Sequence, residues 1–205
     1  HGYLRYGSFS DLWIQVEKKS HAKLFTSITR DLGREEPLHV IQRHNLNLLQ
    51  KPGCLFLPGP GLGEWAQHRT FHGDAQWSLC GITHTTASIR AMDSIADLLL
   101  TPVHPWDALI CTSKAVKNNV VRILQRQADY LRHRFDCKRI PTPQLPIIPL
   151  GVHSKAFLSE ALQKYEAKST LGIPEDAVVF LFVGRLSFHG KAHPLILYRA
   201  LEEAA

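Results

Sequence analysis

An unbroken apolar run, residues 177–183, constrains the fold of this chain more than any other feature. The run reads Ala-Val-Val-Phe-Leu-Phe-Val, is rich in β-branched and aromatic residues, and contains no polar residue. A strand with one face in water alternates apolar and polar residues, whereas a strand buried on both faces of a parallel sheet does not. We therefore predict a central strand of a parallel sheet at these positions.

Shorter apolar runs bounded by turn residues predict four more strands, at residues 38–41, 54–57, 77–83 and 107–111. Helical periodicity predicts helices at residues 12–32, at 88–100, at 113–135 after a cap by Thr112 or Ser113, and near 159–171. Residues 2–7 resemble the exit from a strand. This alternation predicts an α/β fold with a parallel sheet and flanking helices. Proline-rich residues 141–149 predict an edge strand and a stiff linker, which separates a domain at 1–150 from a second at 151–205.

Composition narrows the class of protein. The chain has 205 residues, 44% of them hydrophobic and 20% charged, and a formal net charge of +6. No apolar run approaches the ~18 residues of a membrane span, and the basic residues are dispersed, which argues against a nucleic-acid partner. The cysteines and histidines show no spacing typical of a metal site. We expect a cytoplasmic protein with reduced cysteines, no transmembrane segment and no bound metal.

Two cations follow the apolar run where its strand is predicted to end. Gly184 permits a tight turn, and Arg185 and Lys191 then bring positive charge to the carboxyl end of the sheet, where parallel α/β sheets bind ligands. Such cations stabilise the negative charge that grows on a departing diphosphate. The alternative is that Arg185 pairs with a surface carboxylate and Lys191 points into solvent.

Three motifs occur in a recognisable order: Pro-Leu-Gly-Val at 149–152 followed by Phe157, Leu-Gly-Ile-Pro at 171–174, and Gly-Arg-Leu at 184–186 followed by Lys191. They resemble the hinge, the helix-to-strand turn and the donor-domain opening of family 4 glycosyltransferases, which have two Rossmann-like domains (GT-B type). The resemblance covers residues 146–205. In two places the chain departs from the family pattern: Lys191 follows Arg185 by six residues rather than five, and His153 replaces the hinge Asp.

The resemblance implies a retaining transferase that moves a sugar from a nucleotide-diphosphate donor to an acceptor, which is a saccharide, a lipid or a small molecule. Gly184, Arg185 and Lys191 would bind the donor diphosphate, and no further cofactor is needed. Residues 1–150 would be the acceptor-side domain with its start missing, and 151–205 the linker and opening of a truncated donor domain. The family's paired glutamates would follow position 205, so we expect the chain alone to be inactive.

His84 is the candidate catalytic residue on the acceptor side. It follows the predicted strand 77–83, where the family often has a histidine lining the cleft, and it could bind a sugar hydroxyl or orient an acceptor. Thr85 and Ser113 are further acceptor-side candidates. The alternatives are that threonine hydroxyls satisfy His84 and that Ser113 only caps a helix. The Gly/Pro-rich residues 58–63 lack phosphate-loop spacing and predict a surface turn.

Two other functions remain open at this point. A sugar epimerase or a phosphorylase-like enzyme would share the fold and use different catalytic residues. A non-catalytic α/β phosphate-binding module would need only Arg185 and Lys191.

Overall fold

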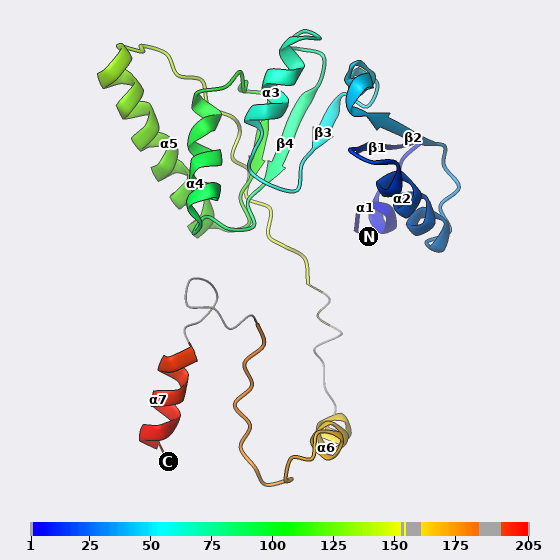
Figure 1. Cartoon of the computed structure of the whole chain (residues 1–205), viewed down its shortest axis with the longest axis vertical. Coiled ribbons are helices and arrows are strands. Elements are labelled where there is room, and N and C mark those ends of the chain that lie inside the picture. The colour runs from blue at the N-terminus through cyan, green and yellow to red at the C-terminus, as the bar shows by residue number, and fades with distance from the viewer. Residues whose placement is uncertain (1, 153, 155–160, 185–193, 205) are drawn as a thin grey trace. The chain divides into compact units, whose positions relative to one another are not determined.

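The computed structural model describes residues 2–152, 154, 161–184 and 194–204. The chain divides into two compact units, His1–Gly151 and Val152–Ala205, and each is described by itself. In chain order, the elements of the first unit are α1 (Gly2–Tyr6), β1 (Leu12–Val16), α2 (Lys19–Asp31), β2 (Leu38–Gln42), the 3-10 helix η1 (Arg43–Gln50), β3 (Cys54–Phe56), α3 (Gly63–Thr70), β4 (Ser78–Ile82), α4 (Ile89–Ala96), the 3-10 helix η2 (Asp97–Leu99), β5 (Ala108–Ile110) and α5 (Lys114–Phe135) (Figure 1).

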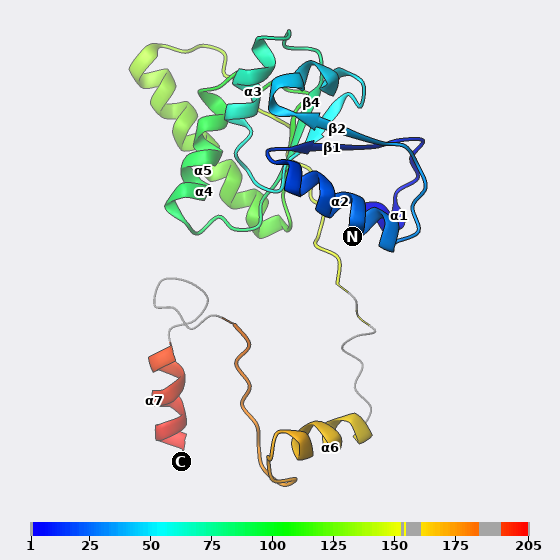
Figure 2. The ribbon, with the colours of Figure 1, turned by 45° about the vertical axis from the view of Figure 1, so that its right-hand side comes forward.

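The strands of the first unit form two parallel sheets. Strands β3, β4 and β5 lie side by side in that order, with Cys54 opposite Ser78 and Cys80 opposite Ala108. Strands β1 and β2 form a separate pair (Figure 2). Helices connect successive strands, as the alternating pattern predicts. The predicted α/β class with parallel sheets and flanking helices is confirmed, and it is compatible with a Rossmann-like arrangement.

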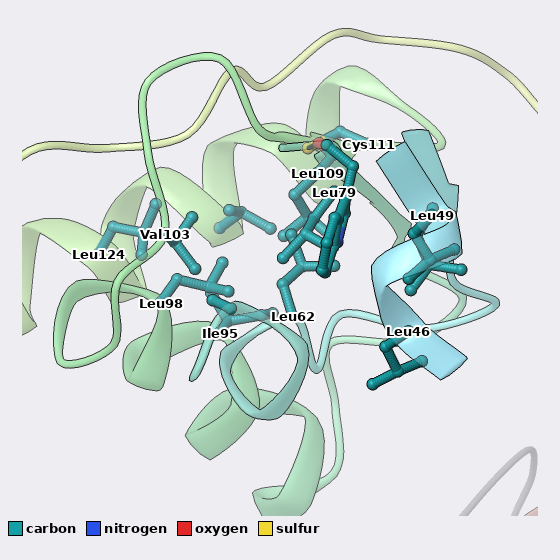
Figure 3. Packing of buried hydrophobic residues seen from close by; sticks show 14 of the residues in the cluster. Leu46, Leu49, Leu62, Leu79, Ile95, Leu98, Val103, Leu109, Cys111 and Leu124 are labelled. Carbon is teal, nitrogen blue, oxygen red and sulfur yellow. Dashed lines mark hydrogen bonds between the residues drawn. The ribbon is translucent and has the colours of Figure 1, made fainter. Parts of the chain in front are cut away.

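One face of the three-stranded sheet is deeply buried. Leu55, Leu79 and Leu109 occupy this face and join a cluster with Ile95 from α4 and Val120 from α5. Figure 3 shows Leu79 and Leu109 of this cluster together with Ile95. Residues on the other face are half-buried or exposed, so the burial pattern alternates along all three strands. The cluster therefore fixes the sheet against the helices and holds the strand ends in place.

The strand and helix predictions from residue 38 to residue 135 are confirmed. The four predicted strands appear as β2, β3, β4 and β5, and the predicted helices as α4 and α5. The side chain of Ser113 caps α5, accepting a hydrogen bond from the backbone N–H of Val116 at 3.1 Å. Proline-rich residues 141–149 extend the sheet beyond β5 by two isolated bridges, Ala108 with Gln144 and Cys111 with Ile147.

Two predictions at the start of the chain are wrong. The single helix predicted over residues 12–32 is a strand, β1, followed by the shorter helix α2. Pairing with β2 accounts for the difference, since tertiary contacts override the helical spacing that Leu12 and Val16 share with later residues. Residues 2–7 form helix α1 and its exit rather than the exit from a strand.

The second unit contains α6 (Ala161–Thr170) and α7 (Pro194–Ala204) among its described residues. Helix α6 confirms the predicted helix near residues 159–171, and Gly172 follows it with a φ of 65°. The buried strand predicted at residues 177–183 is wrong. These residues have no regular structure, and the side chains of Val178, Phe180 and Leu181 are exposed. A strand needs a neighbour for its hydrogen bonds, and the described residues contain none that pairs with this run.

None of the helices in the described residues combines enough length with enough hydrophobicity to cross a bilayer.

Candidate functional site

Three connecting segments gather where β3, β4 and β5 end. They are residues 57–62, 83–88 and 111–113, and together we call them the carboxyl edge. Backbone hydrogen bonds join the first two segments to the end of the next strand: the N–H of Ile82 in β4 donates to the carbonyl of Gly59 at 3.2 Å, and the N–H of Thr83 donates to the carbonyl of Ile110 in β5 at 3.0 Å. The segments therefore lie side by side at the carboxyl edge, the position where parallel sheets bind ligands.

Gly81 allows the first two segments to approach each other. A Cβ atom added there would lie 2.6 Å from the carbonyl oxygen of Gly59 and 2.8 Å from a methyl carbon of Leu62. Residues 58–63, predicted to be a surface turn, thus pack against the end of β4, and Leu62 is fully buried. The glycine inside an apolar strand pattern was the available sequence signal, since such a glycine often marks a close backbone approach.

Two threonines fix the backbone beside His84. Thr83 is fully buried, and its hydroxyl donates to the carbonyl of Ile110 at 3.0 Å. The hydroxyl of Thr112 donates to the carbonyl of Thr83 at 3.3 Å. These bonds tie the ends of β4 and β5 together one residue before His84, so the position of its backbone is well determined.

His84 itself is exposed. Within the described part of the chain its imidazole makes no hydrogen bond, so the threonine hydroxyls do not satisfy it there. An exposed imidazole on a fixed backbone can accept or donate a hydrogen bond at a ligand hydroxyl group.

Thr85 and Ser113 lie on two neighbouring segments of the carboxyl edge, and each side chain makes a hydrogen bond with nearby backbone. The hydroxyl oxygen of Thr85 accepts a hydrogen bond from the N–H of Ala87 at 3.2 Å, and that of Ser113 accepts the capping bond from Val116. A hydroxyl group also has one hydrogen to donate. Both side chains can therefore cap the backbone and still donate to a ligand.

The structure describes all three acceptor-side residues of the predicted site but only one of the three donor-side residues. The structure brings His84, Thr85 and Ser113 to one edge of the first unit. Gly184 is exposed in the second unit, while Arg185 and Lys191 lie outside the described residues. Their part in diphosphate binding stays a prediction.

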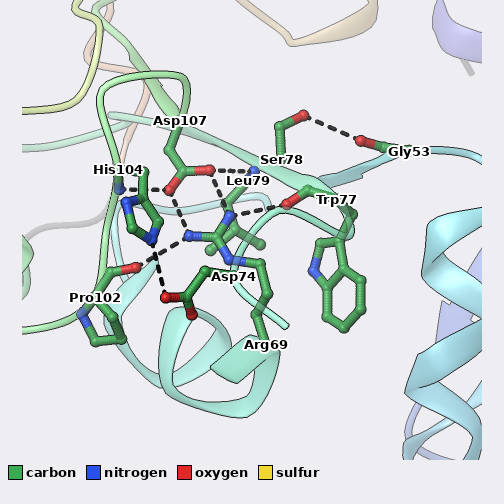
Figure 4. Close-up of polar contacts among 9 residues, drawn as sticks. All are labelled: Gly53, Arg69, Asp74, Trp77, Ser78, Leu79, Pro102, His104 and Asp107. Carbon is green, nitrogen blue, oxygen red and sulfur yellow. Dashed lines mark hydrogen bonds and ion pairs between the residues drawn. The ribbon is translucent and has the colours of Figure 1, made fainter. Parts of the chain in front are cut away.

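Sequence reasoning missed a fully buried ion pair at the opposite, amino edge of the sheet. The guanidinium of Arg69 donates to both carboxylate oxygens of Asp107, at 2.7 and 2.8 Å (Figure 4). Asp107 also accepts hydrogen bonds from the backbone N–H groups of Leu79 and His104, each at 2.8 Å. A carboxylate with so many donors is a structural anchor rather than a reactive group.

A second charged cluster surrounds Arg43, just after β2. Its guanidinium lies 2.6 Å from a carboxylate oxygen of Glu64 and 3.6 Å from one of Glu17, and it also contacts His68. All four side chains are at least one-third exposed. Ion pairs of this kind are screened by water and contribute little to stability.

His39 in β2 forms a further polar contact. Its Nε2 lies 2.7 Å from a carboxylate oxygen of Asp11, and its ring stacks on Trp13 with centroids 4.1 Å apart. The hydrogen bond with His39, followed by one with Ser10, lowers the pKa of Asp11. Since the carboxylate is at the surface, this contact indicates local order rather than a site.

The described residues contain no group of three or more His, Cys, Asp or Glu side chains placed to hold a metal ion. Comparisons of the chain with protein-family models, with curated proteins and with solved structures gave no match. A functional interpretation therefore depends on the carboxyl edge and on the motifs of the sequence.

Proposed function

We propose that the chain is part of a glycosyltransferase of the GT-B type that uses a nucleotide-diphosphate sugar as donor and retains the anomeric configuration. The observation that carries the proposal is the exposed imidazole of His84 at the carboxyl edge, on a backbone fixed by Thr83 and Thr112. The three ordered motifs between residues 149 and 191 support the same reading. A cytoplasmic setting with reduced cysteines belongs to the same proposal.

In this proposal the first unit binds the acceptor. His84 accepts or donates a hydrogen bond at a sugar hydroxyl and orients the reacting groups, which lowers the barrier through positioning. Thr85 and Ser113 donate their remaining hydroxyl hydrogens to the acceptor. These roles need a ligand rich in hydroxyl groups, and a saccharide is the simplest acceptor of that kind.

The donor diphosphate is bound by Gly184, Arg185 and Lys191. Gly184 lets the backbone turn towards the phosphates, and the two cations offset the negative charge that develops when the sugar leaves. Arg185 is the stronger candidate, because Lys191 is one residue further along than in the family pattern.

Titration of the chain with UDP, GDP and ADP tests the donor half. We expect Arg185→Ala to weaken nucleotide binding by about tenfold or more, since a charge-assisted hydrogen bond contributes roughly 1.5–3 kcal/mol. Arg122→Ala is the matched control, because Arg122 is an exposed arginine on α5, in the first unit. Equal binding by Arg185→Ala and the unchanged chain would remove Arg185 from the site.

Acceptor binding tests the other half independently. We expect His84→Ala to bind nucleotide diphosphates like the unchanged chain and to lose binding of an acceptor saccharide. If His84→Ala weakens nucleotide binding as much as Arg185→Ala does, the division into an acceptor half and a donor half is wrong.

A further inference from the structure

A separate groove lies at the amino edge of the β3–β4–β5 sheet, opposite the carboxyl edge. Its volume is about 430 Å³, and its lining consists of Gly53, Ala75, Gln76, Trp77, Ser78 and Trp106. Gly53 directly precedes β3, Ser78 opens β4, and Trp106 lies shortly before β5. We call it the amino-edge groove.

Trp106 forms an exposed aromatic wall of this groove. Its side chain is 48% exposed, and its ring stacks on the imidazole of His104 with centroids 4.2 Å apart and planes 10° apart. The backbone of His104 is itself fixed, because its N–H donates a hydrogen bond to the buried carboxylate of Asp107. A large apolar ring that is fixed on one side and open to solvent is already ordered for a ligand, so binding costs little further side-chain entropy.

Trp77 lines the same groove and has an unsatisfied donor. Only 2% of the residue is exposed, and among the described residues its indole Nε1 has no hydrogen-bond partner. Because this nitrogen is inaccessible to solvent, Trp77 contributes a rigid wall to the groove rather than a donor to a ligand.

The lining carries no charged side chain. It offers two indole rings, the amide of Gln76, the hydroxyl of Ser78 and backbone groups. The hydroxyl of Ser78 donates to the carbonyl of Gly53 at 3.2 Å and keeps its oxygen free to accept. A phosphate or carboxylate would find no countercharge here, whereas a neutral sugar ring presents C–H groups to an indole face and hydroxyls to amide and hydroxyl partners.

We propose that the amino-edge groove binds a neutral saccharide, with one sugar ring against the indole of Trp106 and its hydroxyls near Gln76 and Ser78. This site does not depend on the function proposed above, since it lies at the opposite edge of the sheet and uses none of the same residues.

Saturation-transfer NMR on the whole chain tests this proposal, with maltotriose, cellotriose and mannotriose as probes and adenosine as a planar, non-saccharide probe. We expect at least one trisaccharide to give a signal that Trp106→Ala reduces fivefold or more. Trp106→Phe should retain most of it. The matched control is Tyr130→Ala, which removes a similarly exposed aromatic ring from α5.

Circular dichroism would show whether each variant folds, and Gln76→Ala, at an exposed position, replaces Trp106→Ala if that variant does not. The proposal is overturned if no trisaccharide gives a signal or if the signal survives loss of the Trp106 ring. Binding of adenosine without any trisaccharide would also overturn it. All of these measurements are made in the His84→Ala background, so that saccharide binding at the proposed acceptor site does not contribute to the signal.

Discussion

Charged groups are placed differently at the two edges of the β3–β4–β5 sheet. At the amino edge a full charge pair, Arg69 with Asp107, is buried and surrounded by hydrogen-bond partners. At the carboxyl edge the buried polar groups are neutral, and the ionisable side chain of His84 is left in solvent. The difference indicates that the amino edge anchors the fold, while the carboxyl edge holds an exposed ionisable side chain on a fixed backbone.

The largest expected effect is at the amino edge. Asp107→Ala leaves the guanidinium of Arg69 buried without its partner and removes the acceptor of two backbone N–H groups. We expect the free energy of unfolding to fall by about 3–5 kcal/mol, measured by urea denaturation. The double variant Arg69→Met/Asp107→Leu should recover only the part of this loss that comes from the unpaired charge, because the N–H groups of Leu79 and His104 still lack their acceptor. A loss below about 1 kcal/mol for Asp107→Ala would show that the pair does not anchor this edge.

An intermediate effect is expected where the first two segments of the carboxyl edge touch. Gly81→Ala places a Cβ atom against the carbonyl oxygen of Gly59 and against Leu62, so the loop or the strand must shift. We expect a loss of about 1–3 kcal/mol in the same denaturation experiment. Gly59→Ala is the matched control, because its Cβ would meet nothing within 4 Å and it should change stability by less than about 0.5 kcal/mol. Equal losses for both variants would mean that crowding at Gly81 is not the cause.

The cap of α5 has a smaller expected effect. Ser113→Ala removes the acceptor of the Val116 N–H, and we expect the unfolding free energy to fall by about 1 kcal/mol. Ser113→Asp keeps a capping oxygen but has no hydroxyl hydrogen at neutral pH. It should restore stability without restoring any donation to an acceptor saccharide, so the pair of variants separates the capping role from the binding role. If Ser113→Asp restored acceptor binding as well, Ser113 would have no donor role.

Two predicted strands show what the sequence can and cannot predict. Residues 77–83 mix apolar residues with Ser78, Gly81 and Thr83, and residues 177–183 are apolar throughout. The first becomes β4 because β3 and β5 lie on either side of it. The second has no described strand beside it and stays irregular and exposed. Residue pattern gives the capacity to form a strand, but the neighbours that complete its hydrogen bonds come from distant parts of the chain.

The same limit applies to the sites. The rule that ligands bind beyond the carboxyl ends of parallel strands was enough to select His84, Thr85 and Ser113, because each follows or precedes a local element that periodicity reveals. The pair of Arg69 and Asp107 was missed because 38 positions separate the two residues, and neither carries a local signal of its partner. Contacts across such separations are set by packing, which a single sequence does not display.

The smallest expected effect decides whether the comparison of the two edges holds. His84→Ala removes an exposed imidazole that makes no hydrogen bond within the described residues, so its unfolding free energy should stay within about 0.5 kcal/mol of the unchanged chain. The neighbouring Thr83→Val removes the buried hydrogen bond to Ile110 and should cost about 0.5–1.5 kcal/mol. Urea denaturation of both variants therefore tests whether the structural role of Thr83 and the exposed side chain of His84 are separate, one residue apart. If His84→Ala were the more destabilising of the two, the His84 side chain would be part of the fold's support and the contrast between the two edges would fail.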